Sequence, residues 1–425
     1  MASVDKTKPP AGAAPTNQVF VARQPIMDLQ GEIFGYELLF RAGMENYFPA
    51  DTNQDFAASK VLFDAVSLFG LDTLLDGKRG FLNFTRKLIL EDAATLFPKE
   101  HLVVEVLENV QPDAEILAHC QRLKQTGYTL ALDDFVLAPE WQGLAGLADV
   151  IKVDVRSTNL QACAEIIRTH ARPGLRFLAE KVETQEELHD TQALGFSLFQ
   201  GYYFSKPVII QGRDIAGFKL NYLQLMREVF RPDLDLKQMS AIIQRDVALT
   251  YKLLRFVNSA SFGLVQRIES LNHALTLLGS NEIRKWFALV IIAGMGHDKP
   301  QALSNLSLVR GRFCELMAPV AGFKGRGADL FLMGMFSLID AFLDRPMAEV
   351  LAPLPLAEDV KKALLGEPNR LHDLLALTLA YEKGAWNRVG ELTQALRVPA
   401  QTPPLLYFQS VELANQVFRS EVARS

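Results

Sequence analysis

The sequence predicts an α/β plus all-α protein, in which a (β/α) barrel of the TIM type precedes an all-helical domain. In residues 18–208, short apolar runs alternate with stretches long enough for a helix, as in parallel βαβ units. After residue 208 the alternation stops, and helical periodicities interrupted by proline continue to the end. The 425 residues, 49% of them apolar, are enough for two packed cores.

Seven apolar runs in the first half are predicted strands, and each ends in a polar residue. They cover residues 33–37, 80–83, 102–105, 129–134, 150–154, 175–180 and 197–200. In a (β/α) barrel the C-terminal ends of the strands meet at one rim, where chemistry usually takes place. The polar residues at these ends are Glu37, Asn83, Glu105, Asp133 with Asp134, Asp154, Glu180 and Gln200.

Five or more carboxylates at one rim repel each other strongly unless cations neutralise them. Oxygen-rich acid clusters suit hard divalent ions such as Mg²⁺ or Mn²⁺. The sequence therefore predicts a metal-dependent site at this rim.

Local signals support the helices between the predicted strands. Apolar residues recur at helical spacing after Val110, and Gly127 ends that helix. Thr184 and Glu187 form a capping box that begins another. We expect residues 1–17 to be a disordered tail, residues 18–208 to form the barrel, and residues 209–425 to form a linker helix and the all-α domain.

Composition excludes several function classes. A net charge of −5 argues against nucleic-acid binding, which needs a basic surface. No apolar run approaches the roughly 18 residues that a membrane span needs. The three cysteines are far apart and lie in apolar surroundings, so we expect buried reduced thiols and a cytoplasmic location.

Ordered motifs in the first half resemble those of the EAL domain, the barrel that hydrolyses cyclic di-GMP. The signature Glu-Ala-Leu appears here as Glu37-Leu38-Leu39, followed by Arg41. Further matches follow in the family's order, and several ordered motifs are more specific than one. They are Asn83 with Thr85, Glu105 with Glu108, Asp133-Asp134-Phe135, Lys152 with Asp154, Glu180 with Glu183, and Gln200-Gly201-Tyr202.

The resemblance implies a role for each matching residue. Glu37, Asn83, Glu105 and Asp133 would hold one metal ion, and Asp133 with Asp134 a second. Lys152 would orient the attacking water, and Glu180 would be an essential acid. The implied catalytic residues are thus Lys152, Glu180 and Glu37, and the implied ligand-binding residues are Arg41, Asp154, Gln200 and Glu183.

Three departures from the EAL pattern lie where catalysis is controlled. One is Ala42, which follows Arg41 where the family has a tryptophan. A glycine-rich loop usually follows the paired aspartates, but here residues 136–140 read Val-Leu-Ala-Pro-Glu. Lys181 stands where the family has glycine. A loop of the wrong shape that misplaces a metal by about 1 Å would cost roughly 10²-fold in rate.

The second half resembles an HDOD domain, through DVALTYKLLRFVNSASFG and IESLNHALTLLG. HDOD domains resemble HD-type metal phosphohydrolases that have lost their metal ligands. Ser337 and Leu338 stand where the His and Asp would be, and neither can replace those ligands. The domain is expected to be a non-catalytic interaction module.

The combination resembles the YuxH-type family of bacterial signalling proteins. One interpretation is a regulator whose barrel binds metal and cyclic di-GMP with weak or no turnover, while the HDOD domain contacts a protein partner that the sequence does not identify. The alternatives are an active phosphodiesterase that produces linear pGpG, and an interaction scaffold without nucleotide function. Homodimer formation is left open.

Overall fold

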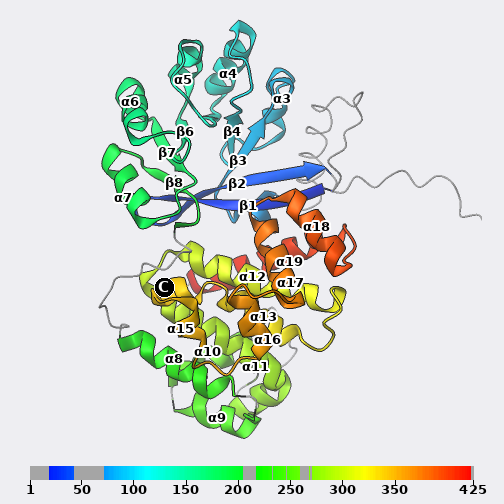
Figure 1. Ribbon diagram of the computed structural model, residues 1–425. Coiled ribbons are helices and arrows are strands. Elements are labelled where there is room, and N and C mark those ends of the chain that lie inside the picture. The colour runs from blue at the N-terminus through cyan, green and yellow to red at the C-terminus, as the bar shows by residue number, and fades with distance from the viewer. Residues whose placement is uncertain are drawn as a thin grey trace, which may run out of the picture.

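The computed structural model describes residues 19–42, 71–203, 217–231, 233–245, 247–258, 268 and 270–422. Eight strands form a closed barrel in sequence order, and the helices that follow form a second body beneath it (Figure 1). The tail expected at residues 1–17 lies outside the described residues. The strands are β1 (Val19–Asp28), β2 (Ile33–Ala42), β3 (Arg79–Phe84), β4 (Leu102–Val106), β5 (Thr129–Leu132), β6 (Val150–Asp154), β7 (Arg176–Glu180) and β8 (Leu198–Gln200).

Helices lie on the outside of the barrel between successive strands (Figure 1). The helix predicted after Val110 is α4, which ends at Gly127 in the left-handed conformation. The capping box of Thr184 and Glu187 begins α7 as predicted. The barrel helices are α2 (Leu71–Leu75), α3 (Arg86–Leu90), α4 (Ala114–Thr126), α5 (Gln142–Leu147), α6 (Leu160–His170) and α7 (Gln185–Leu194).

The strand β1 was not among the seven predicted strands, and it makes the barrel mixed rather than fully parallel. It pairs antiparallel with both β2 and β8. The reason is the short connection to β2, which only antiparallel neighbours allow. The carboxylate of Asp28 accepts hydrogen bonds from the backbone N–H of Gln30 and Glu32, and Gly31 supplies a φ of 77°.

The interior of the barrel contains two layers, because side chains alternate between its two faces. The lower layer is apolar. The upper layer lies two residues further along each parallel strand, toward the C-terminal rim, and contains their polar side chains. In this layer Gln24 of β1 lies opposite Glu37 of β2. The lower layer consists of Ile26, Phe81, Val103, Ala131, Val150, Leu178 and Leu198.

The second body is all-α, as predicted. The predicted linker helix from Asp214 to Phe230 appears as α8, which begins at Gly217 in the described residues. The helices are α8 (Gly217–Val229), α9 (Leu236–Gln244), α10 (Val247–Val257), α11 (Leu271–Met295), α12 (Gln301–Val320), α13 (Gly327–Phe336), α14 (Ile339–Leu343), α15 (Met347–Leu351), α16 (Glu358–Leu364), α17 (Arg370–Glu382), α18 (Trp386–Leu396) and α19 (Thr402–Val422).

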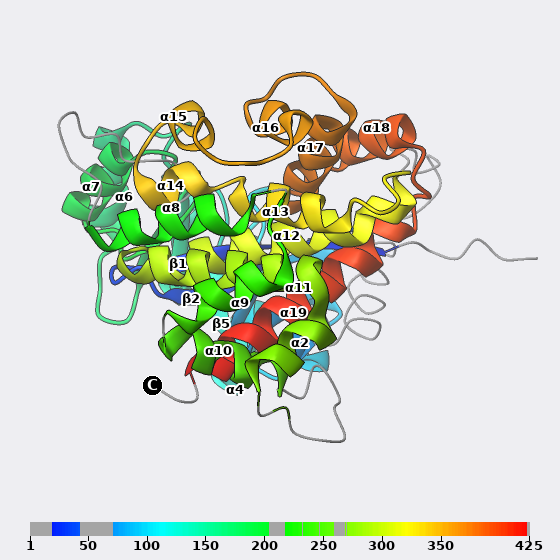
Figure 2. The same ribbon diagram turned by 90° about the horizontal axis from the view of Figure 1, so that it is seen from below.

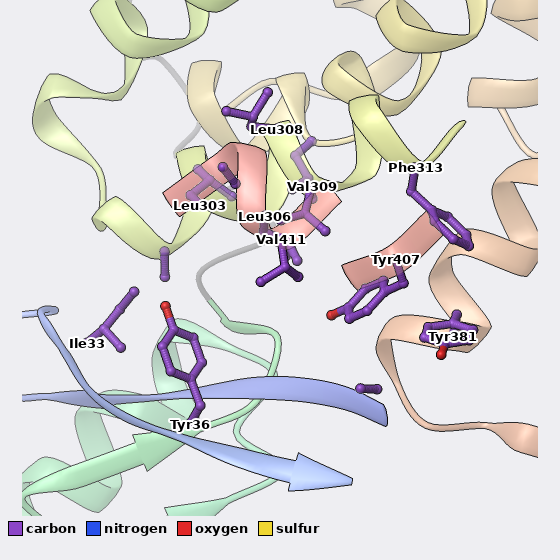
Figure 3. Close-up of a cluster of buried hydrophobic side chains, with 14 of the residues drawn as sticks. Ile33, Tyr36, Leu303, Leu306, Leu308, Val309, Phe313, Tyr381, Tyr407 and Val411 are labelled. Carbon is purple, nitrogen blue, oxygen red and sulfur yellow. The ribbon is translucent and has the colours of Figure 1, made fainter. Parts of the chain in front are cut away.

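These helices cover the barrel on the side of β1 and β2. One cluster of buried apolar side chains continues from the barrel into the helices. Figure 3 shows part of it, where Tyr36 of β2 faces residues of α12 and α19. Aromatic rings extend the contact. The ring centroids of Phe20 in β1 and Trp386 are 5.8 Å apart, and those of Tyr381 and Tyr407 are 4.8 Å apart. The two bodies therefore share a buried interface.

A buried arginine of β1 crosses this interface. The guanidinium of Arg23 donates hydrogen bonds to the carbonyl of Leu74, to Asn305 of α12 and to Asn415 of α19. It also lies over the ring of Tyr36, 4.3 Å from the centroid. Seen from below, α19 crosses the molecule (Figure 2), and it packs against α12. Within the described residues, no helix is long and apolar enough to cross a membrane.

Candidate active site at the barrel rim

The upper layer receives one polar side chain from each of the eight strands. Seven of these residues were predicted from the sequence, and Gln24 of β1 was missed. Its signal was weak, because the run that contains it carries Arg23 and Pro25 and does not end at the rim. The eight residues of the layer are Gln24, Glu37, Asn83, Glu105, Asp133, Lys152, Glu180 and Gln200.

The ammonium of Lys152 lies at the centre of the layer. It is fully buried and forms an ion pair with Glu105, which is also fully buried. Its Nζ lies 2.8 Å from Asp133 and 2.9 Å from Glu180, and Glu37 is 3.8 Å away. One cation thus faces four carboxylates, and the group is strongly negative overall.

The pKa values follow from this charge imbalance. Burial raises the pKa of Glu105 well above its usual range, and Lys152 offsets this only in part. Burial also raises the pKa of Glu180, to about 7. Burial alone would lower the pKa of Lys152, but the carboxylates around it, Glu105 first, raise it well above the usual range. The group therefore favours additional positive charge.

Gln200 links β8 to the first two strands. Its amide donates a hydrogen bond of 2.5 Å to the carboxylate of Glu37 and one of 3.0 Å to the side-chain oxygen of Gln24. These contacts fix the direction in which Glu37 points. The side chain of Arg41, the residue predicted to bind a ligand phosphate, lies outside the described residues.

A second acidic group lies beside the first, at Asp134 and Asp154. Asp134 has a left-handed φ of 41°, and burial raises its pKa. Asp154 forms an ion pair of 2.6 Å with Lys181. Lys181 has a φ of 59°, which favours glycine and explains why glycine is common at this position in the EAL pattern. In this chain the position carries a fixed cation instead.

The remaining predicted residue, Glu183, lies just before α7. Its carboxylate forms an ion pair of 2.9 Å with Arg156, and its backbone N–H donates to Glu187. This places Glu183 in the contacts that organise the start of α7.

The loop after the paired aspartates lacks the glycines of the EAL pattern but is well packed at one end. Phe135 is buried, and its ring lies 6.4 Å from that of Trp141 and 5.3 Å from that of His170. Val136 and Leu137 are exposed, and a 3₁₀ helix (Pro139–Trp141) follows. The loop is therefore held by one aromatic anchor, with two apolar side chains beside the rim.

The donor set fits a hard divalent cation. Within the described residues, no three His, Cys, Asp or Glu side chains converge as on a bound metal ion, and Lys152 occupies the middle of the acids. Yet buried oxygens in this region accept no hydrogen bond from the described residues. They are Asn83 Oδ1, Asp134 Oδ1, Glu180 Oε2 and Gln200 Oε1. Buried oxygens without donors, in a group with excess negative charge, are what an oxygen-preferring ion would satisfy.

The helical domain has no comparable acidic group at the position of the HD motif. Ser337 ends α13 and accepts a hydrogen bond of 3.1 Å from Arg310, and Leu338 is buried. Asn258, which carries part of the HDOD resemblance, bonds locally to the carbonyls of Leu254 and Ile268. These contacts are structural.

Residues 50–207 match the EAL domain family, and residues 218–343 match the HDOD domain family. The EAL match begins after β1 and β2, although both strands close the barrel and supply Gln24 and Glu37. The helices from residue 344 to 422 lie beyond the HDOD match.

Two relatives cover most of the chain. The cyclic di-GMP phosphodiesterase CdgJ of Vibrio cholerae is 39% identical over 372 residues, which are 87% of this chain and 86% of CdgJ. The protein YuxH of Bacillus subtilis is 37% identical over 387 residues, which are 89% of this chain and 94% of YuxH.

Solved structures of EAL proteins are more distant. BlrP1 of Klebsiella pneumoniae, in complex with calcium and cyclic di-GMP, is 24% identical over 47% of this chain and 58% of its own, with a TM-score of 0.37. An EAL domain protein of Listeria monocytogenes is 21% identical over 44% of this chain and 87% of its own, with a TM-score of 0.35. On the strength of the two long relatives, the chain belongs to the family of bacterial proteins in which an EAL domain is followed by an HDOD domain.

Proposed function

We propose that this protein acts in cyclic di-GMP signalling, that its barrel binds a divalent cation and cyclic di-GMP at the rim, and that hydrolysis there is slow or absent. The observation that carries the proposal is the upper layer itself, in which four carboxylates surround one ammonium and neighbouring oxygens lack donors. Family membership supplies the ligand class, since CdgJ is named for cyclic di-GMP.

The cation would be Mg²⁺ or Mn²⁺, since both prefer oxygen ligands. Glu37, Asn83, Glu105 and Asp133 would hold it, and Asp134 would serve a second ion that shares Asp133. A bound divalent ion neutralises charge on a phosphodiester and favours a nucleophilic water. Within the chain, Lys152 would contribute a fixed positive charge next to Asp133 and Glu180.

The slow turnover rests on Lys181. Its ammonium holds Asp154 at 2.6 Å and lies near enough to Asp134 to influence the pKa of that carboxyl. A fixed cation at this point competes with a second metal ion for the same carboxylates, because like charges at close range repel. One-metal binding of the nucleotide would persist, while activation of a water by two ions would be impaired.

A second candidate function, full phosphodiesterase activity, is favoured by one observation. CdgJ, whose sequence aligns with 87% of this chain, is named a cyclic di-GMP phosphodiesterase. The residues that the EAL resemblance implies for catalysis, Lys152, Glu180 and Glu37, all lie in the upper layer. In this case Lys181 would leave Asp154 when substrate and metal bind.

The test is incubation of the full chain with cyclic di-GMP and Mg²⁺ or Mn²⁺, followed by chromatography of the products, together with a calorimetric titration in Ca²⁺. Binding with little or no pGpG supports the proposal, and multiple turnovers per minute would establish the second candidate. Neither binding nor product would leave an interaction scaffold.

The variant Glu37→Ala tests whether cyclic di-GMP binds at the upper layer. We expect it to abolish metal-dependent nucleotide binding without unfolding the protein, because it removes a carboxylate of the upper layer that faces Gln200. Glu91→Ala is the matched control, since Glu91 is exposed on the barrel and pairs with Lys87 at the end of α3. If Glu37→Ala bound cyclic di-GMP with unchanged metal dependence, the site would lie elsewhere.

A further inference from the structure

The helical domain contacts the rim of the barrel through Tyr202, two residues after Gln200. The ring of Tyr202 lies under the ammonium of Lys383, 4.9 Å from Nζ to the ring centroid. Tyr202 and Glu382, the last residue of α17, line the same small cavity, and both burial and this carboxylate raise the pKa of Tyr202. Tyr202 is thus held by two consecutive residues of the helical domain.

Glu382 is itself fixed by an arginine of α12. Nε and Nη2 of Arg310 donate parallel hydrogen bonds of 2.7 and 2.8 Å to the two carboxylate oxygens. Both residues are almost completely buried. A bidentate pair without access to water has little freedom to rotate or exchange partners. The carboxylate that faces Tyr202 therefore has one position.

The backbone between Tyr202 and Gln200 passes close to Val182 at a position that only glycine can occupy. Gly201 has a φ of 147°, and a Cβ at this residue would overlap the carbonyl oxygen of Val182. The N–H of Val182 donates to the carbonyl of Gln200, and the N–H of Tyr203 donates to the carbonyl of Val182. The backbone on both sides of Gly201 is therefore hydrogen-bonded to Val182, which links the position of Tyr202 to that of Gln200.

Gln200 ends this series of contacts at a predicted metal ligand. Its amide holds Glu37 at 2.5 Å, and Gln24 holds the same amide from the other side. Residues that orient a metal ligand typically affect metal affinity by about 10–100-fold, although they never touch the ion.

We propose that Glu382 and Tyr202 are positioning residues for the barrel site: the Arg310–Glu382 pair of the helical domain fixes Tyr202, and Tyr202 fixes the Gln200 amide that orients Glu37. This inference rests on the proposed function, because Glu37 must serve as a metal ligand for its orientation to matter. In this arrangement the helical domain contributes to the site of the barrel and is not a separate module.

The experiment measures the affinity of the full chain for Mn²⁺ alone, by calorimetry or by the Mn²⁺ resonance signal, so no turnover is needed. Tyr202→Phe removes only the hydroxyl and keeps the ring beneath Lys383. Tyr381→Phe is the matched control, because it removes a buried hydroxyl from the same interface, one that faces the backbone of Val21 instead. Thermal unfolding of each variant establishes that it is folded.

We expect Tyr202→Phe to weaken Mn²⁺ binding roughly tenfold, and Tyr381→Phe to leave it within a factor of two. Glu382→Gln and the double variant Tyr202→Phe/Glu382→Gln should weaken it by the same factor as Tyr202→Phe, because all three interrupt one connection. This non-additivity distinguishes positioning from general loosening of the interface.

Three results would overturn the inference. If wild-type protein binds Mn²⁺ and Tyr202→Phe binds it equally well, the connection does not position Glu37. If Tyr202→Phe and Tyr381→Phe weaken binding equally, the interface matters but this path does not. If wild-type protein binds no Mn²⁺, the proposed function fails and the inference falls with it.

Discussion

Each domain buries a group of charged residues, and the two groups differ in their balance. At the barrel rim, one ammonium faces four carboxylates, and oxygens nearby lack hydrogen-bond donors. In the helical domain, one guanidinium faces one carboxylate, and two parallel hydrogen bonds join them. In the first arrangement carboxylates outnumber cations, whereas in the second each charge has a partner.

This difference distinguishes a binding site from a structural contact more clearly than burial does. Lys152, Glu105, Arg310 and Glu382 are all nearly inaccessible to water. A buried ion pair alone is weak evidence of function, since its desolvation cost can exceed its Coulomb gain. Excess charge of one sign is more informative, because only proton uptake or a ligand of the opposite sign relieves it.

The largest expected effect comes from removing the cation of the unbalanced group. Lys152→Ala would leave Glu105, Asp133 and Glu180 facing one another, at a cost of about 3–5 kcal/mol in unfolding free energy. We expect a clearly lower melting temperature in EDTA and recovery of most of this loss in millimolar Mn²⁺, measured by thermal unfolding. The recovery occurs because metal that binds only the folded state stabilises it.

Lys124→Ala is the control for this comparison. Lys124 pairs with Asp149 in the same barrel at 2.6 Å, away from the upper layer. Its loss should be smaller and insensitive to Mn²⁺. Equal recovery in both variants, or none in Lys152→Ala, would contradict the distinction between the two charged groups.

The balanced group should respond to substitution without any effect of metal. Arg310→Met leaves Glu382 buried without its partner and should cost about 3–5 kcal/mol in urea unfolding, with or without Mn²⁺. The double variant Arg310→Met/Glu382→Leu should regain most of that stability, because no unpaired charge remains. Ser337→Ala removes the hydrogen bond that Arg310 donates to Oγ and the one that Oγ donates to the carbonyl of Gly334, and should cost about 1–2 kcal/mol. A double variant no more stable than Arg310→Met would show that the pair is not self-contained.

The smallest effect concerns the second acidic group. Lys181→Gly removes the cation that holds Asp154 and suits the left-handed backbone, so stability should change little. Hydrolysis of cyclic di-GMP in Mn²⁺ should rise roughly tenfold, since the carboxylates become available to a second ion. Lys181→Arg keeps the charge and should show no rise in product formation. A rate in Lys181→Gly at or below wild type would remove Lys181 as the restraint on turnover.

The sequence predicted the barrel and most of its site because both depend on local pattern. An apolar run that ends in a polar residue identifies a strand and its rim together, and six of the eight upper-layer residues follow from that rule. The seventh, Lys152, lies two residues before the end of its run and was predicted only from the EAL resemblance. Gln24 was not predicted because β1 runs in the opposite direction. The residue of β1 that faces the rim therefore lies within the strand and not at its end.

The contacts between the domains could not be predicted in this way. The sequence motif marks Tyr202 as a rim residue, but nothing local indicates that Glu382, about 180 positions later, faces its hydroxyl. The pairing depends on how α12 and α17 pack against the barrel. Ser337 was predicted from the sequence to lack a ligand role, but its contact with Arg310 depends on the same packing and was not predicted.

The position of Arg23 also has a consequence for how the protein is made. Its guanidinium on β1 is satisfied by Asn415 of α19, which the ribosome adds 392 residues later. At about 5–20 residues per second, the strand waits between roughly 20 and 80 s for its partner. During that interval the side of β1 that α19 later covers is exposed to solvent.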